Sequence, residues 1–271
     1  MTADYIPYPS PTPHLTAGRR GATGWLVLNR PERRNALSAE MWRAIPHLVR
    51  RLADDVEIRA MALIGEGGEA FAAGADISEF AGNRDDAEAA RRYDAMTLEA
   101  FSALQECGKP VIAVIDGYCL GGGLALALAC DIRIASDRSI FALPQARLGL
   151  AYPLTGLRQL LATVTAARAK ELLFTARRVE AAEALRIGLV HATVGAASLR
   201  AEAESILSMV AANAPLSIAA AKRMINALSG VAGDAGEDRL AALSDACFDS
   251  EDYKEGRSAF LEKRPPQFSG R

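Results

Sequence analysis

The chain has 271 residues, of which 50% are hydrophobic and 24% are charged, as in an ordinary soluble globular protein. This length is sufficient for one large α/β domain with a sizeable core. The formal net charge of −2 gives no general electrostatic reason to bind nucleic acid or an anionic membrane, so any anionic ligand must be held by local groups. The four cysteines lack C-x-x-C spacing and the three histidines are scattered, so we expect no metal site.

The N-terminal residues are rich in proline and lack a basic start followed by an apolar core. They predict an extended, loosely ordered lead-in over 1–20 and no secretory signal. The most apolar stretch, 111–130, is interrupted by Asp116 and four glycines. A membrane span needs roughly 20 predominantly apolar residues without such breaks, so we interpret the stretch as a buried core segment. We therefore expect a cytoplasmic protein with no membrane partner.

Short β-rich runs alternate with longer helical patterns along the first two thirds of the chain. The predicted strands are 23–29, 59–65, 110–116, 131–136, 139–143 and 189–194. The predicted helices are 38–53, 85–105, 120–129 and 157–174. This alternation indicates right-handed βαβ crossovers and a largely buried sheet.

The pattern changes from about residue 198 onward. Helical segments then follow one another without a convincing strand between them, at 198–212, 215–228, 237–248 and 251–263. We therefore predict a strand-and-helix core over 1–197 and a helical C-terminal region over 198–271.

A glycine-rich run at 65–70 follows a predicted strand and fits the loose dinucleotide-binding pattern G-x-G-x-x-A. That fingerprint needs a helix that opens at the glycines and an acidic residue about twenty positions later. Here another turn follows, at 71–76, and the later acidic residues lie in a helical pattern. The sequence also lacks a G-x-x-x-x-G-K-[ST] motif, so the nicotinamide and nucleotide-phosphate interpretations fail.

Two predicted strand-to-helix junctions, at 72–76 and 120–124, carry small residues. Each one alone fits a tight turn or close helix packing, with Asp76 capping the first. Each also offers a backbone amide at a helix start, where the first N–H groups have no internal partner and lie at the positive end of the dipole. Together, an amide near Ala75 and one near Gly122 are what a two-donor oxyanion hole requires.

Six segments, in this order, resemble the crotonase (enoyl-CoA hydratase/isomerase) superfamily over nearly the whole chain. They are LNRPERRNALS (28–38), FAAGADISEF (71–80), KPVIAVIDGYCLGGGLALALACDIRIAS (109–136), FALPQARLGL (141–150), AAEALRIGLV (181–190) and SEDYKEGRSAFLEKRPPQF (250–268). The resemblance implies an α/β fold with a spiral ββα core and a C-terminal helical region that forms homotrimers, which often pair into hexamers. It also implies an acyl-CoA substrate, with coenzyme A as part of the substrate and no separate cofactor.

The resemblance further implies roles for particular residues. The amides of Ala75 and Gly122 bind the thioester carbonyl oxygen in this interpretation. Further contacts to the substrate are expected from Ala73, Asp76, Ile77, Gly121 and Ala125. Three basic residues are candidates for the coenzyme A phosphates, or are otherwise solvated surface charges: Arg33, Arg34 and, from a neighbouring subunit, Lys263.

Two positions depart from the pattern of the family's hydratases, which carry glutamates that orient and activate the added water. This chain has Ala125 and Gln145 there, and no acidic residue occurs from 141 to 170. Alanine cannot transfer a proton, and a neutral amide forms hydrogen bonds but is no ordinary general base. The sequence therefore argues against a standard hydratase or a carboxylate-dependent isomerase.

Decarboxylation of a malonyl-type thioester needs no carboxylate base, because the departing carbon dioxide leaves its electron pair to form the enolate. Segments 148–156 and 169–176 are similar to parts of methylmalonyl-CoA decarboxylase, a crotonase relative in which a tyrosine at the position of Tyr152 contacts the substrate carboxylate. That enzyme has histidine where this chain has Ala75, but only the backbone amide is needed there. For Tyr152, the alternative is a loop aromatic packed over its own core.

We therefore predict decarboxylation, with Gln145 and Tyr152 as catalytic side chains. Two alternatives remain. One is a hydratase-type lyase or isomerase acting on an unusual enoyl-CoA, and the other is a catalytically silent acyl-CoA-binding paralogue. The acyl group depends on side chains of the helix predicted at 85–105, which the pattern does not orient.

Overall fold

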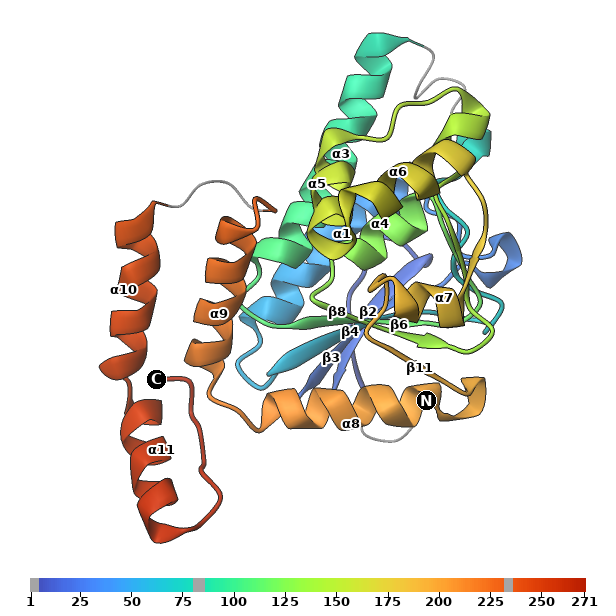
Figure 1. The fold of residues 1–271 in the computed structure, drawn as a ribbon. Helices are drawn as coiled ribbons and strands as arrows, with labels where there is room; N and C mark the ends of the chain where they lie inside the picture. The colour runs from blue at the N-terminus through green and yellow to red at the C-terminus, as the bar shows by residue number, and fades with distance from the viewer. Residues whose placement is uncertain (1–4, 80–85, 232–235) are drawn as a thin grey trace.

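The computed structural model describes residues 5–79, 86–231 and 236–271, and a seven-stranded sheet lies at its centre (Figure 1). The strand order is β1-β2-β3-β4-β6-β8-β11, in which β3 to β11 are parallel and β1 and β2 add an antiparallel edge. The strands are β1 Ile6–Tyr8, β2 Leu15–Arg20, β3 Thr23–Leu28, β4 Ala60–Gly65, β6 Val111–Ile115, β8 Ile132–Ser136 and β11 Ala192–Val194. The main strands coincide with the predicted ones, although β11 begins three residues later than predicted.

A smaller sheet carries the segments that lead into the two small-residue junctions. Its order is β10-β9-β7-β5, with β10 Val179–Glu180, β9 Ile140–Ala142, β7 Tyr118–Leu120 and β5 Ala70–Ala72. Because β5 and β7 are parallel neighbours, the turns that follow them lie at the same edge of the sheet. The two junctions are thereby brought together.

Residues 5–20 of the predicted lead-in are extended but not loosely ordered, and residues 1–4 lie outside the described part of the chain. Residues 6–8 and 15–20 are strands of the main sheet, and β2 pairs with β3 over its whole length. Leu15 and Ala17 of β2 are buried in the main core. The prediction of loose order was wrong because the nearby prolines made the short alternating pattern of β2 hard to recognise in the sequence.

Helices cover both faces of the main sheet. Figure 1 shows α1, α3, α4, α5 and α6 on one side of the sheet and α8 on the other. The first group comprises α1 Ala39–Asp54, α3 Ala87–Glu106, α4 Gly122–Leu128, α5 Leu154–Thr163 and α6 Ala166–Thr175, followed in sequence by α7 Ala181–Arg186. Short 3₁₀ turns lie at η1 Pro31–Arg33, η2 Ile77–Glu79, η3 Pro144–Leu148 and η4 Ala196–Ser198.

The helix predicted over 157–174 is in fact two helices. Val164 has extended backbone and ends α5, and Thr165 caps α6 by accepting a hydrogen bond from the Arg168 amide. A β-branched pair at this point favours extended backbone and a new N-cap over a continuous helix. The loop that precedes α5 is therefore followed by a short helix that is separate from α6.

The C-terminal helices are α8 Leu199–Ala211, α9 Pro215–Leu228, α10 Glu237–Phe248 and α11 Glu251–Glu262. Leu199, Ala203 and Leu207 of α8 are buried in a second core against sheet residues that include Trp25 and Ile112. Helix α8 thus packs on the sheet like a core helix, whereas α9 to α11 extend to one side of it (Figure 1). The domain boundary at 197/198 and the role of the C-terminal region in trimers stay predictions.

Lys222 attaches α9 to the rest of the protein. Its side chain is almost fully buried, and Nζ donates to the carbonyl oxygens of Leu104 and Lys109 at 2.7 and 3.0 Å and to Asp131 Oδ2 at 2.8 Å. All three ammonium protons therefore have acceptors.

Among the described residues, no single helix is long and apolar enough to cross a membrane. One pair of helices, Ala196–Ala211 and Pro215–Leu228, passes that test together by length and composition but is bent by 105°.

Candidate active site

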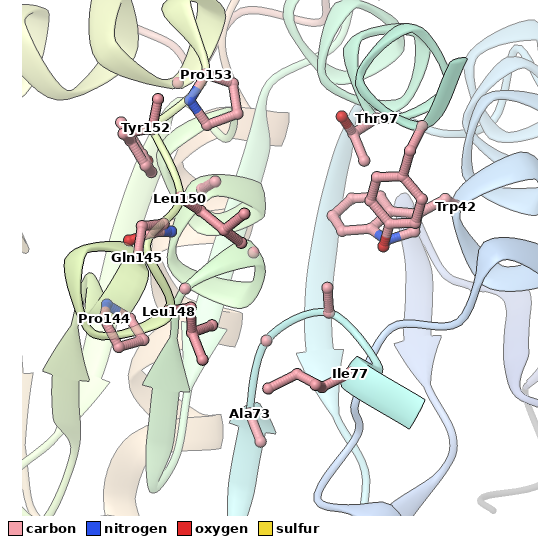
Figure 2. A pocket seen from close by; sticks show the side chains of 18 of the residues that line it. Trp42, Ala73, Ile77, Thr97, Pro144, Gln145, Leu148, Leu150, Tyr152 and Pro153 are labelled. Carbon is pink, nitrogen blue, oxygen red and sulfur yellow. The ribbon is translucent and has the colours of Figure 1, made fainter. Parts of the chain in front are cut away.

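A pocket of about 110 Å³ lies where the two junctions meet. The turn after β5 and the start of α4 form its base, the η3–α5 segment forms one wall, and α1 with α3 forms the opposite wall (Figure 2). Eight of the predicted site residues line it: Ala73, Ala75, Ile77, Gly121, Gly122, Ala125, Gln145 and Tyr152.

The turn after β5 leaves the Ala75 amide without an acceptor. Gly74, with φ of 114°, reverses the chain here, which is a conformation that glycine adopts readily. The Leu37 amide donates to the Gly74 carbonyl at 2.8 Å, and the Asp76 amide donates to the Leu37 carbonyl at 2.9 Å. These two bonds fix the turn on either side of Ala75. Its own N–H has no hydrogen-bond acceptor among the described residues.

The start of α4 presents the second amide. Gly121 has φ of 50° and donates to the Ala142 carbonyl at 2.8 Å, so the turn into α4 is fixed by β9. Gly122 is the first residue of α4, and its N–H has no intrahelical acceptor. A Cβ placed on Gly122 would lie 3.2 Å from the Ala75 nitrogen. The two unpaired amides therefore lie close together, as an oxyanion hole requires.

Asn35, which lies in the motif at 28–38, helps to hold the oxyanion-hole turns in place. Its buried side chain donates to the Glu66 and Ala70 carbonyls at 2.9 and 2.7 Å, and its Oδ1 accepts from the Arg30 amide at 2.8 Å. It thereby fastens the segment before α1 to β5. Asn35 lies within the motif at 28–38, but its role could not be predicted from the sequence.

The η3–α5 wall carries polar atoms that have no partner in the described part of the chain. Gln145 Oε1 and the Tyr152 hydroxyl are both buried without a hydrogen bond. The Tyr152 ring packs on Gly156, where an added Cβ would lie 2.9 Å from the Tyr152 Cζ atom. Burial raises the pKa of Tyr152, so this hydroxyl stays protonated and can donate a hydrogen bond.

The sequence predicted that the helix at 85–105 shapes the acyl pocket, but not which of its side chains line the opposite wall, nor that α1 contributes to this wall. It consists of Trp42 from α1 and of Tyr93, Thr97 and Phe101 from α3 (Figure 2). The helical pattern identifies such residues as inward-facing, but it does not separate a residue that fills the core from one that also contacts a pocket.

The pocket lining contains no Asp, Glu, His, Lys or Arg among the residues that the structure describes. Asp76 is not among these lining residues. Its carboxylate pairs with Arg30 at 2.6 Å and accepts hydrogen bonds from the Ser78 amide and hydroxyl at 3.0 and 2.6 Å. Although burial acts in the opposite direction, these hydrogen bonds lower the pKa of Asp76. Asp76 therefore holds the turn that carries Ala75.

The three predicted phosphate-binding residues do not line the pocket. Arg33, Arg34 and Lys263 are exposed. Arg34 forms an ion pair with Glu69 at 2.7 Å and lies over the Tyr118 ring, 5.6 Å from its centroid. Lys263 follows the last residue of α11. Their contacts with coenzyme A stay predictions.

Known proteins are similar to this chain over most of its length. A model of the enoyl-CoA hydratase/isomerase family matches residues 20–271. A short-chain-enoyl-CoA hydratase of Clostridium acetobutylicum is 36% identical over 249 residues, which cover 91% of this chain and 94% of the relative. A carnitinyl-CoA dehydratase of Proteus mirabilis is 36% identical over 263 residues, which cover 95% and 98%.

A solved structure is similar over almost the same span. This protein, assigned to the enoyl-CoA hydratase/isomerase family in Hyphomonas neptunium, has a TM-score of 0.91 at 38% identity, with 97% of this chain and 100% of that chain covered. The chain therefore belongs to the enoyl-CoA hydratase/isomerase family, the crotonase superfamily, whose enzymes act on acyl-CoA thioesters.

Proposed function

We propose that this enzyme decarboxylates a malonyl-type CoA ester. The observation that carries the proposal is a pocket that joins two unpaired amides to a buried, unpaired tyrosine hydroxyl, without a carboxylate among its described lining residues. Such a site can stabilise an enolate, but it lacks the side chains that ordinarily take a proton from water.

The oxyanion hole drives bond cleavage in this mechanism. The thioester oxygen lies between the amides of Ala75 and Gly122. As the bond between the α-carbon and the carboxylate breaks, carbon dioxide departs and its electron pair forms the enolate. The negative charge on the thioester oxygen then grows, so both amide hydrogen bonds are stronger in the transition state than in the ground state.

Tyr152 orients the leaving carboxylate. Its protonated hydroxyl donates a hydrogen bond that holds the carboxylate perpendicular to the thioester plane, where the breaking bond overlaps the carbonyl π-system. The unpaired Gln145 Oε1 accepts a hydrogen bond from the water molecule that delivers a proton to the α-carbon, and the hydroxide that remains combines with the departing carbon dioxide to form bicarbonate. Arg33, Arg34 and the Lys263 of a neighbouring subunit contact the coenzyme A phosphates in this proposal.

A purified-enzyme screen tests the proposal. Malonyl-, methylmalonyl-, enoyl- and 3-hydroxyacyl-CoA esters are incubated with the protein, and products are identified by mass spectrometry. We expect loss of carbon dioxide from a malonyl-type ester. Turnover confined to enoyl- or hydroxyacyl-CoA would contradict decarboxylation, and tight binding without any turnover would identify a silent paralogue.

Hydration of an enoyl-CoA is the second candidate function. It is favoured by the hydratase and dehydratase names of the relatives and by Gln145 Oε1, which can accept a hydrogen bond from an added water. We expect the wild-type enzyme to hydrate crotonyl-CoA poorly, because Ala125 and Gln145 transfer no proton. The double change Ala125→Glu with Gln145→Glu should raise that rate. Efficient hydration by the unmodified enzyme would place this candidate ahead of decarboxylation.

A further inference from the structure

Trp42 lies directly beside the oxyanion hole. A Cβ placed on Gly122 would lie 3.3 Å from Trp42 Cζ2, closer than ordinary van der Waals contact. The indole edge therefore borders the space that an acyl group enters once its carbonyl oxygen is bound at Gly122. Figure 2 shows Trp42 on the wall opposite Gln145 and Tyr152.

The indole ring is held rigidly in that position. Trp42 Nε1 donates to the Tyr93 hydroxyl at 3.0 Å, and the Phe101 ring packs edge-on against the indole with centroids 5.7 Å apart and planes at 87°. Trp42 is 1% exposed, and α1 is packed on the main core along its length. A side chain fixed by a hydrogen bond and by close packing forms a fixed end to the pocket rather than an adaptable wall.

We propose that Trp42 is the specificity-determining residue of this site and restricts the enzyme to short acyl groups. This inference rests on the proposed function and adds a preference for acyl-chain length to it. The carboxylate of a malonyl-type substrate lies toward Tyr152, and the remaining substituent of the α-carbon lies toward Trp42. A methyl group fits between the α-carbon and the indole edge, whereas a longer chain meets the ring.

Binding of saturated acyl-CoA esters tests this role separately from catalysis. Butyryl-, hexanoyl-, octanoyl- and decanoyl-CoA have no carboxylate to lose, so their dissociation constants do not depend on decarboxylation. Each methylene that enters an apolar pocket tightens binding by about four-fold. In the wild type, affinity should stop rising with chain length at a short acyl chain. In Trp42→Leu it should continue to rise for at least two more methylenes, which is roughly fifteen-fold for the longer ester.

Two controls separate specificity from folding. Trp42→Ala opens more space than Trp42→Leu but removes more of the core, so the leucine variant serves if the alanine variant does not fold. Trp25→Phe alters the chain's other tryptophan, which is buried on the opposite face of the sheet against α8. Its chain-length profile should match the wild type, and Trp42 remains as its only fluorescent tryptophan. Short acyl-CoA esters should therefore change the emission of Trp25→Phe.

The outcomes distinguish the two proposals. An unchanged chain-length profile in Trp42→Leu, or acyl-CoA binding to Trp25→Phe without a change in emission, would overturn the role of Trp42. Absence of decarboxylation together with the expected shift in profile would contradict the proposed reaction and leave the specificity role intact. Failure of the wild type to bind any saturated acyl-CoA would overturn the inference and the acyl-group placement on which it rests.

Discussion

Gly122 contributes only a backbone amide to the site, so its role can be tested through that atom. Proline is well tolerated as the first residue of a helix, and it lacks the N–H. Gly122→Ala adds a side chain but keeps the amide, so it reports the crowding against Ala75 and Trp42. We expect turnover by Gly122→Pro to lie about 100- to 1,000-fold below that of Gly122→Ala. Equal rates in two folded variants would exclude the amide as a donor.

Tyr152→Phe removes one hydroxyl and keeps the ring that packs on Gly156. A hydrogen bond to a charged group contributes roughly 1.5–3 kcal/mol, so kcat/KM for malonyl-type esters should fall by about one to two orders of magnitude. The free protein should be no less stable, because this buried hydroxyl has no partner in the described chain. Thermal unfolding and butyryl-CoA binding are the controls. Unchanged decarboxylation would leave Tyr152 as a packing residue.

The small residues of the site were easier to predict than the large ones. Ala75 and Gly122 could be inferred because turns that expose amides need small residues, and the family motifs marked both turns. Trp42 and Phe101 could not, since their helical spacing is also that of ordinary core residues. For Asp76, the sequence suggested a role that its side-chain contacts do not support. Its place in the motif suggested a substrate contact, but its carboxylate is occupied by Arg30 and Ser78.

At the scale of elements, the turn between β5 and η2 depends on the charge of Asp76. Its hydrogen bonds make the pKa lower in the folded than in the unfolded chain, so the stabilisation is present above the unfolded value of about 4. It is lost as the pH falls through the folded-state pKa. We expect Asp76→Asn to lower the free energy of unfolding by roughly 1.5–3 kcal/mol near neutral pH and by progressively less in acid.

Denaturant titrations across this pH range measure the effect. The matched control is Asp54→Asn, which removes an exposed carboxylate at the end of α1 that has no ion pair among the described residues. A pH-independent loss of stability in Asp76→Asn would show that packing, rather than the carboxylate charge, holds the turn.

Most of the long periodic elements were predicted well, and several of the short strands were not: β9 and β11 lie within predicted strands, but β5, β7 and β10 do not. Helix α1 has a strong apolar stripe and a Ser38 cap, so the sequence marks both its face and its start. Strands β5, β7 and β10 have two or three residues each, too few for an alternating pattern to appear. They form because β5 pairs with β7 and β10 pairs with β9, which is information that lies outside each segment.

At the scale of the whole molecule, Lys222 is the main polar link between α9 and the core. Lys222→Met leaves Asp131 and the two carbonyl oxygens without their shared donor. Removing one partner of a buried ion pair costs about 3 kcal/mol at the lower end of the known range, which suits a pair whose carboxylate is partly exposed. Denaturant unfolding should show this loss, and amide exchange in α9 should rise. Lys254→Met, at an exposed ion pair within α11, is the control and should change little.

The fold class could be predicted because strand–helix alternation and the family motifs agree. The path of the C-terminal region could not be predicted. Helical periodicity identifies α8 and α9 but does not say that α8 packs under the sheet, or that the backbone carbonyls of Leu104 and Lys109 receive Lys222. Such contacts join residues far apart in sequence, and no local pattern encodes them.

The position of α8 matters while the chain is being synthesised. The described residues that line the pocket all lie between Trp42 and Gly156, whereas β11 and α8 begin at Ala192 and Leu199. The N-terminal part of the chain leaves the ribosome first. The pocket walls therefore emerge while the face of the sheet that carries Trp25 and Ile112 is still uncovered. Until α8 arrives, that apolar face is what chaperones and other nascent chains encounter. The aggregation hazard of newly made protein is therefore set by the helix that covers the sheet, not by the catalytic pocket.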